Sequence, residues 1–194
     1  MMKLIAITGG IGSGKSVVSR IVTVMGYSVY DCDSRARSLM IEDAMVRQQL
    51  IQTFGASTYH HDGTLNRAHL SLKAFSNPDT LARLNAIVHP ATAADLSRWA
   101  GVQAAHKAKA AFVETALLRT AGLDHVVDEV WHVTAPTALR IARVMARSGL
   151  TSDQIKERIS AQRDEEAVAD GEHILVNDGV SALLPQVLKL VDYN

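Results

Sequence analysis

The feature that most constrains the fold of this chain is a glycine-rich loop close to its amino end. Residues 9–16, GGIGSGKS, fit the pattern G-x-x-x-x-G-K-[ST] in full. An apolar run at 3–8 precedes the loop, and apolar residues at helical spacing follow it. Glycines let successive backbone N–H groups point at one anion, and the N-terminus of the following helix adds a favourable dipole. The sequence therefore predicts a strand, a loop that binds nucleotide phosphates and a helix, in that order.

Each residue type in this loop has a part in that chemistry. The ammonium of Lys15 is a point charge for the β- and γ-phosphates, and the hydroxyl of Ser16 is a ligand for Mg²⁺. The loop alone does not separate a kinase from a GTPase or a motor ATPase, although the sequence has no Asn-Lys-x-Asp motif for guanine. The residues expected to contact the nucleotide here are Gly9, Gly12, Ser13, Gly14, Lys15, Ser16 and Val17.

Four more short apolar runs predict further strands, at 27–31, 110–114, 129–133 and 173–176. Helical stretches separate them, which is typical of a parallel sheet with helical crossovers. The expected fold is α/β, a doubly wound sheet of five parallel strands. Because proline fits the first position of a helix, Asn77-Pro78 and His89-Pro90 are both expected to begin helices. Thr151 to Gln154 forms a capping box, and a last helix is expected over 180–191.

The chain length of 194 residues fits one domain with an inserted part. The stretch from about 34 to 109 is mostly helical and lies between the second and third predicted strands. We therefore expect an inserted helical subdomain there, with the core formed by 1–33, 110–140 and 172–194.

The composition argues against several classes of partner. Lys plus Arg and Asp plus Glu each number 20, so the formal net charge is zero and binding of long nucleic acids is disfavoured. No apolar run approaches the roughly 18 residues that span a membrane, and the first residues do not resemble a secretory signal. Cys32 is the only cysteine, so an intrachain disulfide is impossible, which fits a reducing compartment. We expect a cytoplasmic location.

Two carboxylates follow the second predicted strand, in the sequence Asp31-Cys32-Asp33. Ligands of doubly wound sheets bind outside the carboxyl ends of the strands. A carboxylate at that place can accept a proton from an acceptor hydroxyl, or hold Mg²⁺ through water. The alternative is that both residues are helix caps or solvated turn residues.

A basic segment lies at 140–163, where six Lys and Arg residues stand against two acids. Arg140, Arg143 and Arg147 are three and four residues apart, so they share one face of a helix. Arginine binds phosphate oxygens in a two-point fashion. We expect a helical lid over about 141–171, with Arg143 and Arg147 on the ATP phosphates. The alternative is a solvated basic face that pairs with the acids at 164–166.

The order of these motifs resembles that of the dephospho-CoA kinase family, which belongs to the P-loop kinases. The run 7–16, ITGGIGSGKS, is similar to the family's phosphate loop, including its doubled glycine. Asp31-x-Asp33 followed by Ala36 and Arg37 is similar to its catalytic-aspartate segment. Further similarities cover nearly the whole chain, at 54–55, 62–67, His89-Pro90, Arg143 to Gly149, 159–162 and Asn177.

The resemblance implies the last step of coenzyme A synthesis, in which ATP phosphorylates the ribose 3′-hydroxyl of dephospho-CoA. It places the catalytic base on Asp33, while Lys15 and Mg²⁺ neutralise the developing charge. It assigns the inserted subdomain to the acceptor, with Arg67 on the acceptor's pyrophosphate and His89 on the substrate side. The alternatives are a surface salt bridge for Arg67, and a helix cap or a satisfied core histidine for His89. The cofactors implied are ATP and Mg²⁺.

The chain departs from the family pattern in four places. Val17 replaces the usual Thr, and residues 116–120, ALLRT, lack the Pro and Glu of P-L-L-f-E. Arg140 stands where the family often has Gln, and Gly171-Glu172 stands where it has Ala-Asp. Glu114, at the end of the third predicted strand, is the candidate carboxylate beside Mg²⁺. Two alternatives stay open: another small-molecule P-loop kinase with a nucleoside or nucleotide acceptor, and a nucleotide-gated binding protein without transfer chemistry. The expected partners are small-molecule substrates, without nucleic acid or membrane, and the expected state is a monomer or small homo-oligomer.

Overall fold

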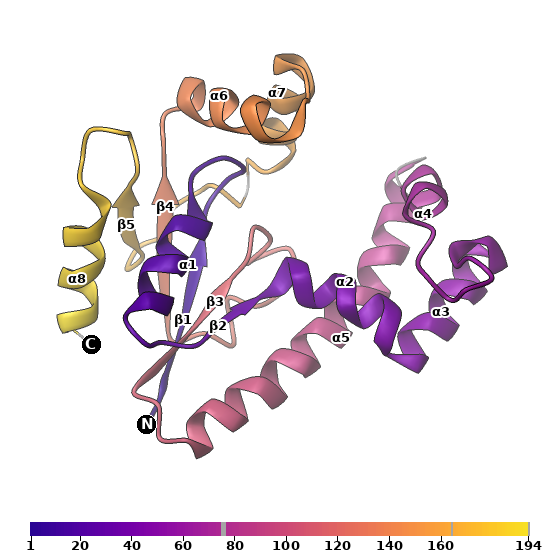
Figure 1. Ribbon diagram of the computed structural model, residues 1–194, viewed down its shortest axis with the longest axis horizontal. Coiled ribbons are helices and arrows are strands. Elements are labelled where there is room, and N and C mark those ends of the chain that lie inside the picture. Colours follow the sequence, from indigo (N-terminus) through magenta and orange to yellow (C-terminus); the bar gives the residue numbers. More distant parts are fainter. Residues whose placement is uncertain (75–76, 164, 194) are drawn as a thin grey trace. The chain divides into compact units, whose positions relative to one another are not determined.

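The structure is a computed structural model that describes residues 1–74, 77–163 and 165–193 (Figure 1). Two compact units make up the chain. The first unit comprises Met1–Asp31 and Ala100–Asn194, and the second comprises Cys32–Trp99. Among the described residues, no helix combines the length and the apolar character that crossing a bilayer requires.

The first unit is built on a five-stranded sheet in the order β2-β3-β1-β4-β5, in which every neighbouring pair is parallel. The five predicted strands are confirmed. The central strand β1 spans Lys3–Thr8, and the others are β2 (Val29–Asp31), β3 (Ala110–Glu114), β4 (Glu129–Thr134) and β5 (His173–Val176). A parallel sheet covered by helices needs strands that are apolar on both faces, which is what these short runs supply.

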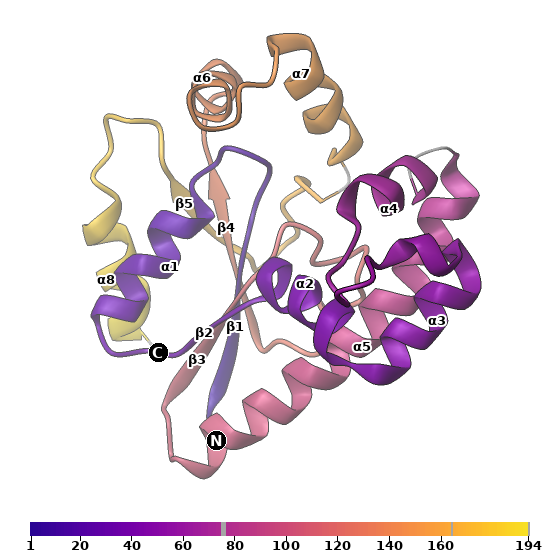
Figure 2. The ribbon, with the colours of Figure 1, turned by 45° about the vertical axis from the view of Figure 1, so that its right-hand side comes forward.

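The core of this unit lies between the sheet and two helices. Helices α1 (Lys15–Val24) and α8 (Leu183–Tyr193) contact each other and cover the same face of the sheet (Figure 2). Val18 and Val22 of α1 pack with strand residues such as Phe112 and Trp131, whose ring centroids are 5.0 Å apart. This packing fixes the direction in which α1 leaves the glycine-rich loop.

The last helix begins later than the sequence suggested, at Leu183 instead of 180. The carboxylate of Asp178 accepts hydrogen bonds from the backbone N–H groups of Val180 and Ser181, at 2.9 and 2.7 Å. These bonds hold 178–181 in a turn, because a short side-chain acceptor competes with the helix for the same amides.

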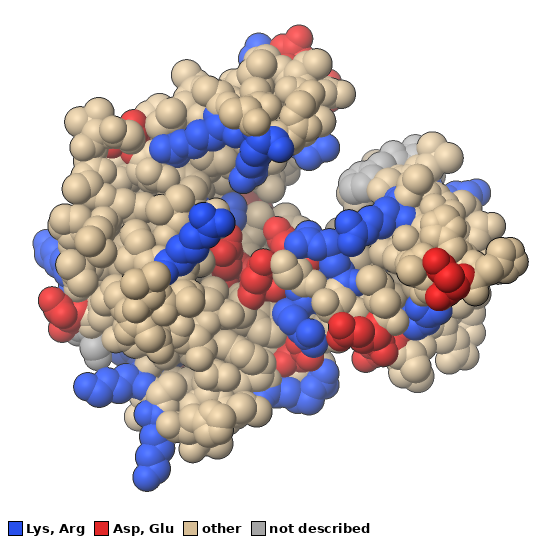
Figure 3. Space-filling model, in the orientation of Figure 1, with Lys and Arg blue, Asp and Glu red and all other residues tan. Residues whose placement is uncertain are grey.

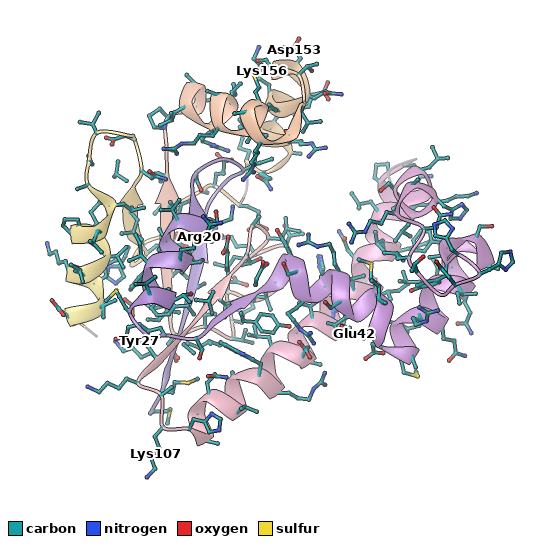
Figure 4. All side chains as sticks on the ribbon, in the orientation of Figure 1. Arg20, Tyr27, Glu42, Lys107, Asp153 and Lys156 are labelled. Atoms are coloured by element: carbon teal, nitrogen blue, oxygen red, sulfur yellow. The ribbon has the colours of Figure 1, made fainter. Side chains whose placement is uncertain are left out.

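Two further helices follow β4, α6 (Thr137–Ser148) and α7 (Ser152–Ala161). Gly149 ends α6 in the left-handed conformation, and the predicted capping box at Thr151 and Gln154 begins α7. On α7, Lys156 donates to Asp153 at 3.0 Å, and both side chains lie at the exposed end labelled in Figure 4. The side of α6 and α7 opposite these two side chains is therefore the side that can pack against the rest of the unit.

The second unit is helical, as predicted for the middle of the chain. It contains α2 (Cys32–Glu42), α3 (Ala44–Phe54), the short 3₁₀ helix η1 (Ala56–Thr58), α4 (Arg67–Ala74) and most of α5 (Pro78–Ala105). A small core of its own holds these helices together, formed by Val46, Leu50, Phe54, Leu70 and Ala74.

One predicted helix start in this unit is wrong. Asn77-Pro78 does begin a helix, since the Asn77 side chain accepts from Thr80 N–H at 2.9 Å. Pro90 lies inside the same 28-residue helix and begins nothing. Proline inside a helix costs about 3 kcal/mol, but the buried residues Val88, Thr92 and Leu96 continue at intervals of four across it. Packing along this stripe outweighs the lost hydrogen bond.

Candidate functional site

The glycine-rich loop of residues 9–14 joins the centre of the sheet to the start of α1. Gly14 is the N-cap of α1 and has a φ of 102°, a left-handed conformation that side chains rarely adopt. A Cβ at Gly14 would also lie 2.0 Å from Nδ2 of Asn177. Glycine is thus required at this position for both its backbone conformation and its neighbour.

Three successive carbonyl groups of the loop are held by side chains from outside it. Arg140 Nε donates to Ile11 O at 2.8 Å, Arg143 Nη1 to Gly12 O and Ser13 O at 3.4 Å each, and Asn177 Nδ2 to Ser13 O at 2.8 Å. The C=O and N–H of a trans peptide point in opposite directions. The N–H groups of residues 12–14 are therefore turned away from these side chains. That of Ser13 donates to Gly10 O at 3.2 Å, which leaves those of Gly12 and Gly14 for an anion.

Lys15 lies across this loop. Its ammonium group donates to Gly9 O at 2.8 Å and to Gly10 O at 3.3 Å. Ser16 and Val17 follow in the first turn of α1 and are exposed. Lys15, Ser16 and Val17 thus place an ammonium, a hydroxyl and the first amides of a helix at the end of a loop whose Gly9, Gly12 and Ser13 are buried, and such groups suit phosphate oxygens.

The end of the sheet beside the loop also carries carboxylates. Asp31 ends β2 and Glu114 ends β3, and the two residues are partners in the strand register. Glu114 in turn pairs with Ile7 of β1, just before the loop. The candidate metal-ligand atoms at this edge are all oxygen atoms, which Mg²⁺ prefers. Among the residues that the structure describes, three or more acidic, His or Cys side chains do not gather into a metal site. These residues fit Mg²⁺ as an ion held by few protein oxygens and by phosphate, its usual manner of binding.

The three arginines of α6 differ in their surroundings. Arg140 is only 6% exposed and makes a two-point ion pair with Glu166, at 2.8 and 2.5 Å. Arg143 Nη2 contacts the carbonyl and side-chain oxygens of Asn177 at 3.1 and 3.2 Å, and among described residues it meets no carboxylate. Arg147 is exposed. Lys and Arg side chains gather along this part of the surface (Figure 3).

The sequence left two interpretations of the basic segment, a lid and a face that pairs with the acids at 164–166. Among the described residues, such pairing occurs for Arg140 alone of the three arginines. Glu165 contacts other groups, and Asp164 lies outside the described residues. Arg143, whose guanidinium touches the phosphate loop itself, keeps its charge uncompensated by the described acids.

Residues on the segment after α7 complete the support of the loop. Gln162 Oε1 accepts from Ile11 N–H at 2.8 Å, so both polar groups of Ile11 are fixed, one by Gln162 and one by Arg140. Sequence reasoning gave Glu166 only as a partner of the basic face and Gln162 only as part of the resemblance at 159–162, and it expected neither to support the loop. The doubled glycine in the sequence was the signal that could have pointed to this contact. Gly10 has no left-handed φ that would require glycine, but a Cβ there would lie 2.1 Å from Glu166 Oε1. Gly10 is needed because the ion pair passes so close.

The altered segment 116–120 belongs to a separate buried network. The Glu165 carboxylate accepts from the backbone N–H groups of Arg119 and Thr120, at 3.0 and 2.6 Å. The Arg119 guanidinium contacts Glu172 at 2.5 Å, and Glu172 contacts Nδ1 of His132 at 3.2 Å. Burial lowers the pKa of His132, and the hydrogen bond that its ring makes to the Glu172 carboxylate opposes this shift only in part. The network ties the loop after β3 to the segment before β5.

The second unit holds the other predicted site residues. Asp33 is exposed in the first turn of α2, and Arg37 lies one helical turn further on. Arg67 begins α4, and it lines a cavity together with Arg37. His89 is partly buried on α5 and does not line this cavity.

A parallel sheet in this strand order, with a lysine-bearing phosphate loop between its central strand and α1, defines a P-loop kinase. The arginine-bearing helix beside the loop agrees with that class. The chain belongs to the dephospho-CoA kinase family, whose model matches residues 3–182.

Individual relatives are similar over nearly their whole length. Dephospho-CoA kinase of Porphyromonas gingivalis is 37% identical over 193 residues, which is 98% of this chain and 94% of the relative. That of Salinibacter ruber is 41% identical over 180 residues, 92% of this chain and 90% of the relative. The crystal structure of TT1252 from Thermus thermophilus has a TM-score of 0.83 at 31% identity, and the match covers 99% and 97% of the two chains.

Proposed function

We propose that this chain transfers the γ-phosphoryl group of ATP to the ribose 3′-hydroxyl of dephospho-CoA, giving CoA and ADP. The observation that carries the proposal is the phosphate loop, whose carbonyls are bound from behind by Arg140, Arg143 and Asn177. Membership of the dephospho-CoA kinase family supports the choice of acceptor. The reaction is the last step of coenzyme A synthesis, and we place it in the cytoplasm, in a monomer or small homo-oligomer.

In the transfer, a bond forms between the 3′-oxygen and the γ-phosphorus while the bond from that phosphorus to the β,γ-bridging oxygen breaks. The proton of the hydroxyl passes to the carboxylate of Asp33, and the electron pair of the broken bond leaves with ADP. Such a transition state is loose, so positioning and charge neutralisation supply most of the acceleration. Lys15 supplies positive charge at the β- and γ-phosphates, and Arg143, which holds the loop carbonyls, adds its charge from the carbonyl side of the loop.

Mg²⁺ would be held by the Ser16 hydroxyl and by phosphate oxygens, with Glu114 as the carboxylate beside it. The ion supplies charge neutralisation across the β- and γ-phosphates when it is bound. The stretch 141–171, which includes most of α6 and all of α7, acts as the lid that excludes water. Arg147, which is exposed on α6, reaches the phosphates when the lid closes.

The second unit, Cys32–Trp99, most of which lies within the stretch 34–109, binds the acceptor. Asp33 orients the hydroxyl, Arg67 contacts the pyrophosphate, and His89 lies on the substrate side of α5. The role proposed for Arg67 is supported by its position in the wall of a cavity, where the residue is exposed.

The test is coupled ADP release with dephospho-CoA, run on the wild type and on Asp33→Asn. Loss of a general base lowers kcat about 10²- to 10⁴-fold, and ATP affinity stays the same because Asp33 is not part of the phosphate loop. The matched control is Asp79→Asn, which removes another exposed carboxylate from the first turn of a helix in the same unit. If Asp33→Asn releases ADP as fast as the wild type, Asp33 is not the general base.

A panel of other acceptors in the same assay separates the alternatives. If dephospho-CoA is ignored and a nucleoside or nucleotide is phosphorylated, the chain is a different small-molecule kinase. If ATP binds and every acceptor fails to release ADP, the chain is a binding protein.

A further inference from the structure

The segment after α7 carries three side chains that bind different parts of the first unit. Gln162 Oε1 accepts from Ile11 N–H at 2.8 Å. Glu166 pairs with Arg140, which donates to Ile11 O. Both of these contacts lead to the phosphate loop. Glu165 instead binds the loop after β3, where its carboxylate accepts from two backbone N–H groups. The segment therefore joins the phosphate loop to a part of the chain that has no role in the transfer itself.

These three side chains are held together by the backbone that carries them. The N–H groups of Glu165 and Glu166 both donate to Gln162 O, at 3.0 and 3.1 Å. Glu165 is only 4% exposed, so a shift of its carboxylate away from the two amides would leave a buried charge without partners. The position of Glu165 therefore sets the positions of Gln162 and Glu166.

Arg119 fixes this segment from the other side of the contact. Its backbone N–H donates to Glu165 Oε2 at 3.0 Å, and its Nη1 donates to Glu165 O at 3.2 Å. Its Nη2 donates to Glu172 Oε1 at 2.5 Å, and Glu172 also contacts Nδ1 of His132 on β4. One planar guanidinium thus binds the chain at residue 165 and again at residue 172, just before β5.

The surroundings of Arg119 distinguish this contact from an ordinary surface ion pair. Surface pairs contribute little, because water screens them. Here the side chain of Glu172 is 8% exposed, and loss of Arg119 would leave that carboxylate buried without its cation. Arg119 belongs to the segment 116–120, in which the chain departs from the family pattern. The departure therefore brings an arginine to the place where two buried acids need one.

We propose that Arg119 and Glu165 are positioning residues for ATP binding. They hold Gln162 and Glu166 against the phosphate loop, and so keep both polar groups of Ile11 in the conformation that receives the nucleotide. Both residues act through Gln162 and Glu166, and neither is assigned a contact with the nucleotide. The inference rests on the proposed function in that ATP is the nucleotide.

The experiment is a calorimetric titration of the full chain with ATP, at a temperature well below the melting temperature of every variant. Arg119→Ala is expected to weaken ATP binding about 10-fold, the equivalent of one weakened hydrogen bond at the loop. Arg119→Lys keeps the cation but reaches only one of the two acceptors, Glu165 O or Glu172 Oε1. Its ATP affinity is expected to lie between those of Arg119→Ala and the wild type.

A double-mutant cycle separates positioning from a general loss of stability. In the Gln162→Ala, Glu166→Ala background, the two side chains through which Arg119 acts are gone. Arg119→Ala is then expected to change ATP affinity by less than about twofold, although it still lowers the melting temperature. If Arg119→Ala does not fold, the same cycle is run with Arg119→Lys.

Two control variants belong to the same unit but not to this network. Lys189→Ala removes an exposed cation from α8, and Val187→Ala removes buried packing between α8 and the sheet. Val187→Ala is expected to lower the melting temperature, and both variants are expected to bind ATP like the wild type.

Wild-type ATP affinity in Arg119→Ala overturns the proposal, and so does an equally large loss of affinity in the background without the side chains of Gln162 and Glu166. The ADP-release assay is read separately. If Arg119→Ala weakens ATP binding as expected but the wild type does not phosphorylate dephospho-CoA, the proposed function fails and the role of Arg119 stands.

Discussion

Gly10→Ala tests whether the ion pair between Arg140 and Glu166 holds the phosphate loop in its binding conformation. The added Cβ would lie 2.1 Å from Glu166 Oε1 and 2.3 Å from Arg140 Nη2. Gly10 has no left-handed φ, so alanine suits its backbone, and the change acts only by pushing the pair aside. Arg140 would then lose its bond to Ile11 O, the fixed point at the tip of the loop.

The size of the effect follows from the bonds at stake. A hydrogen bond that involves a charged group is worth about 1.5–3 kcal/mol. Loss of one such bond predicts ATP binding that is about 10- to 100-fold weaker, and a free energy of unfolding that falls by a similar number of kcal/mol. Calorimetric titration with ATP and a urea melt measure the two quantities on the same variant.

Two comparison variants test whether Gly10→Ala acts through the ion pair. Gly101→Ala is the matched control, because no other group lies within 4 Å of a Cβ at that position. In the Glu166→Ala background the clash with the carboxylate is gone, so Gly10→Ala is expected to add much less to the loss of ATP affinity than it does alone. A Gly10→Ala variant that binds ATP as tightly as the wild type refutes the role of the pair.

Two further predictions concern charged groups of the first unit. Burial holds the pKa of His132 below its ordinary 6.5, so the unfolded chain takes up a proton first and the free energy of unfolding falls as the pH drops through 6.5 and below. Urea melts at several pH values are expected to show a shallower fall for His132→Gln, and an unchanged slope would contradict this. Arg143→Ala is expected to raise the KM for ATP more than Arg147→Ala does, because Arg143 alone of the two contacts the loop carbonyls. Equal effects in initial-rate assays would show that the loop contact is unimportant.

The elements of the fold could largely be predicted from the sequence because their signals are local. Buried parallel strands are short apolar runs, and the capping box at Thr151 needs only four residues. Pro90 was misjudged because the same residue type is favourable at a helix start and tolerated inside a helix that is held by packing. The stripe that holds it becomes visible only when the buried side of α5 is known.

The phosphate loop could be predicted at its own residues, but its supports could not. Gln162 and Asn177 bond to residues 151 and 164 positions earlier in the chain, and no local pattern encodes those distances. The ion pair of Arg140 and Glu166 depends in the same way on how the segment after α7 returns to the sheet. The sequence shows a glycine at position 10, but only the structure shows that its φ is not left-handed and that the nearby ion pair requires it.

The contact between Asn177 and Ser13 has a consequence for the synthesis of the protein. The loop is synthesised well before the amide that holds its carbonyl, because Asn177 lies 164 residues after Ser13, just after β5. Chains are made from the amino end at about 5–20 residues per second, so a nascent chain carries the loop for several seconds before its support exists. Tight ATP binding is therefore acquired only after Asn177 has been made, and ATP stabilises chains that contain Asn177 in preference to shorter ones.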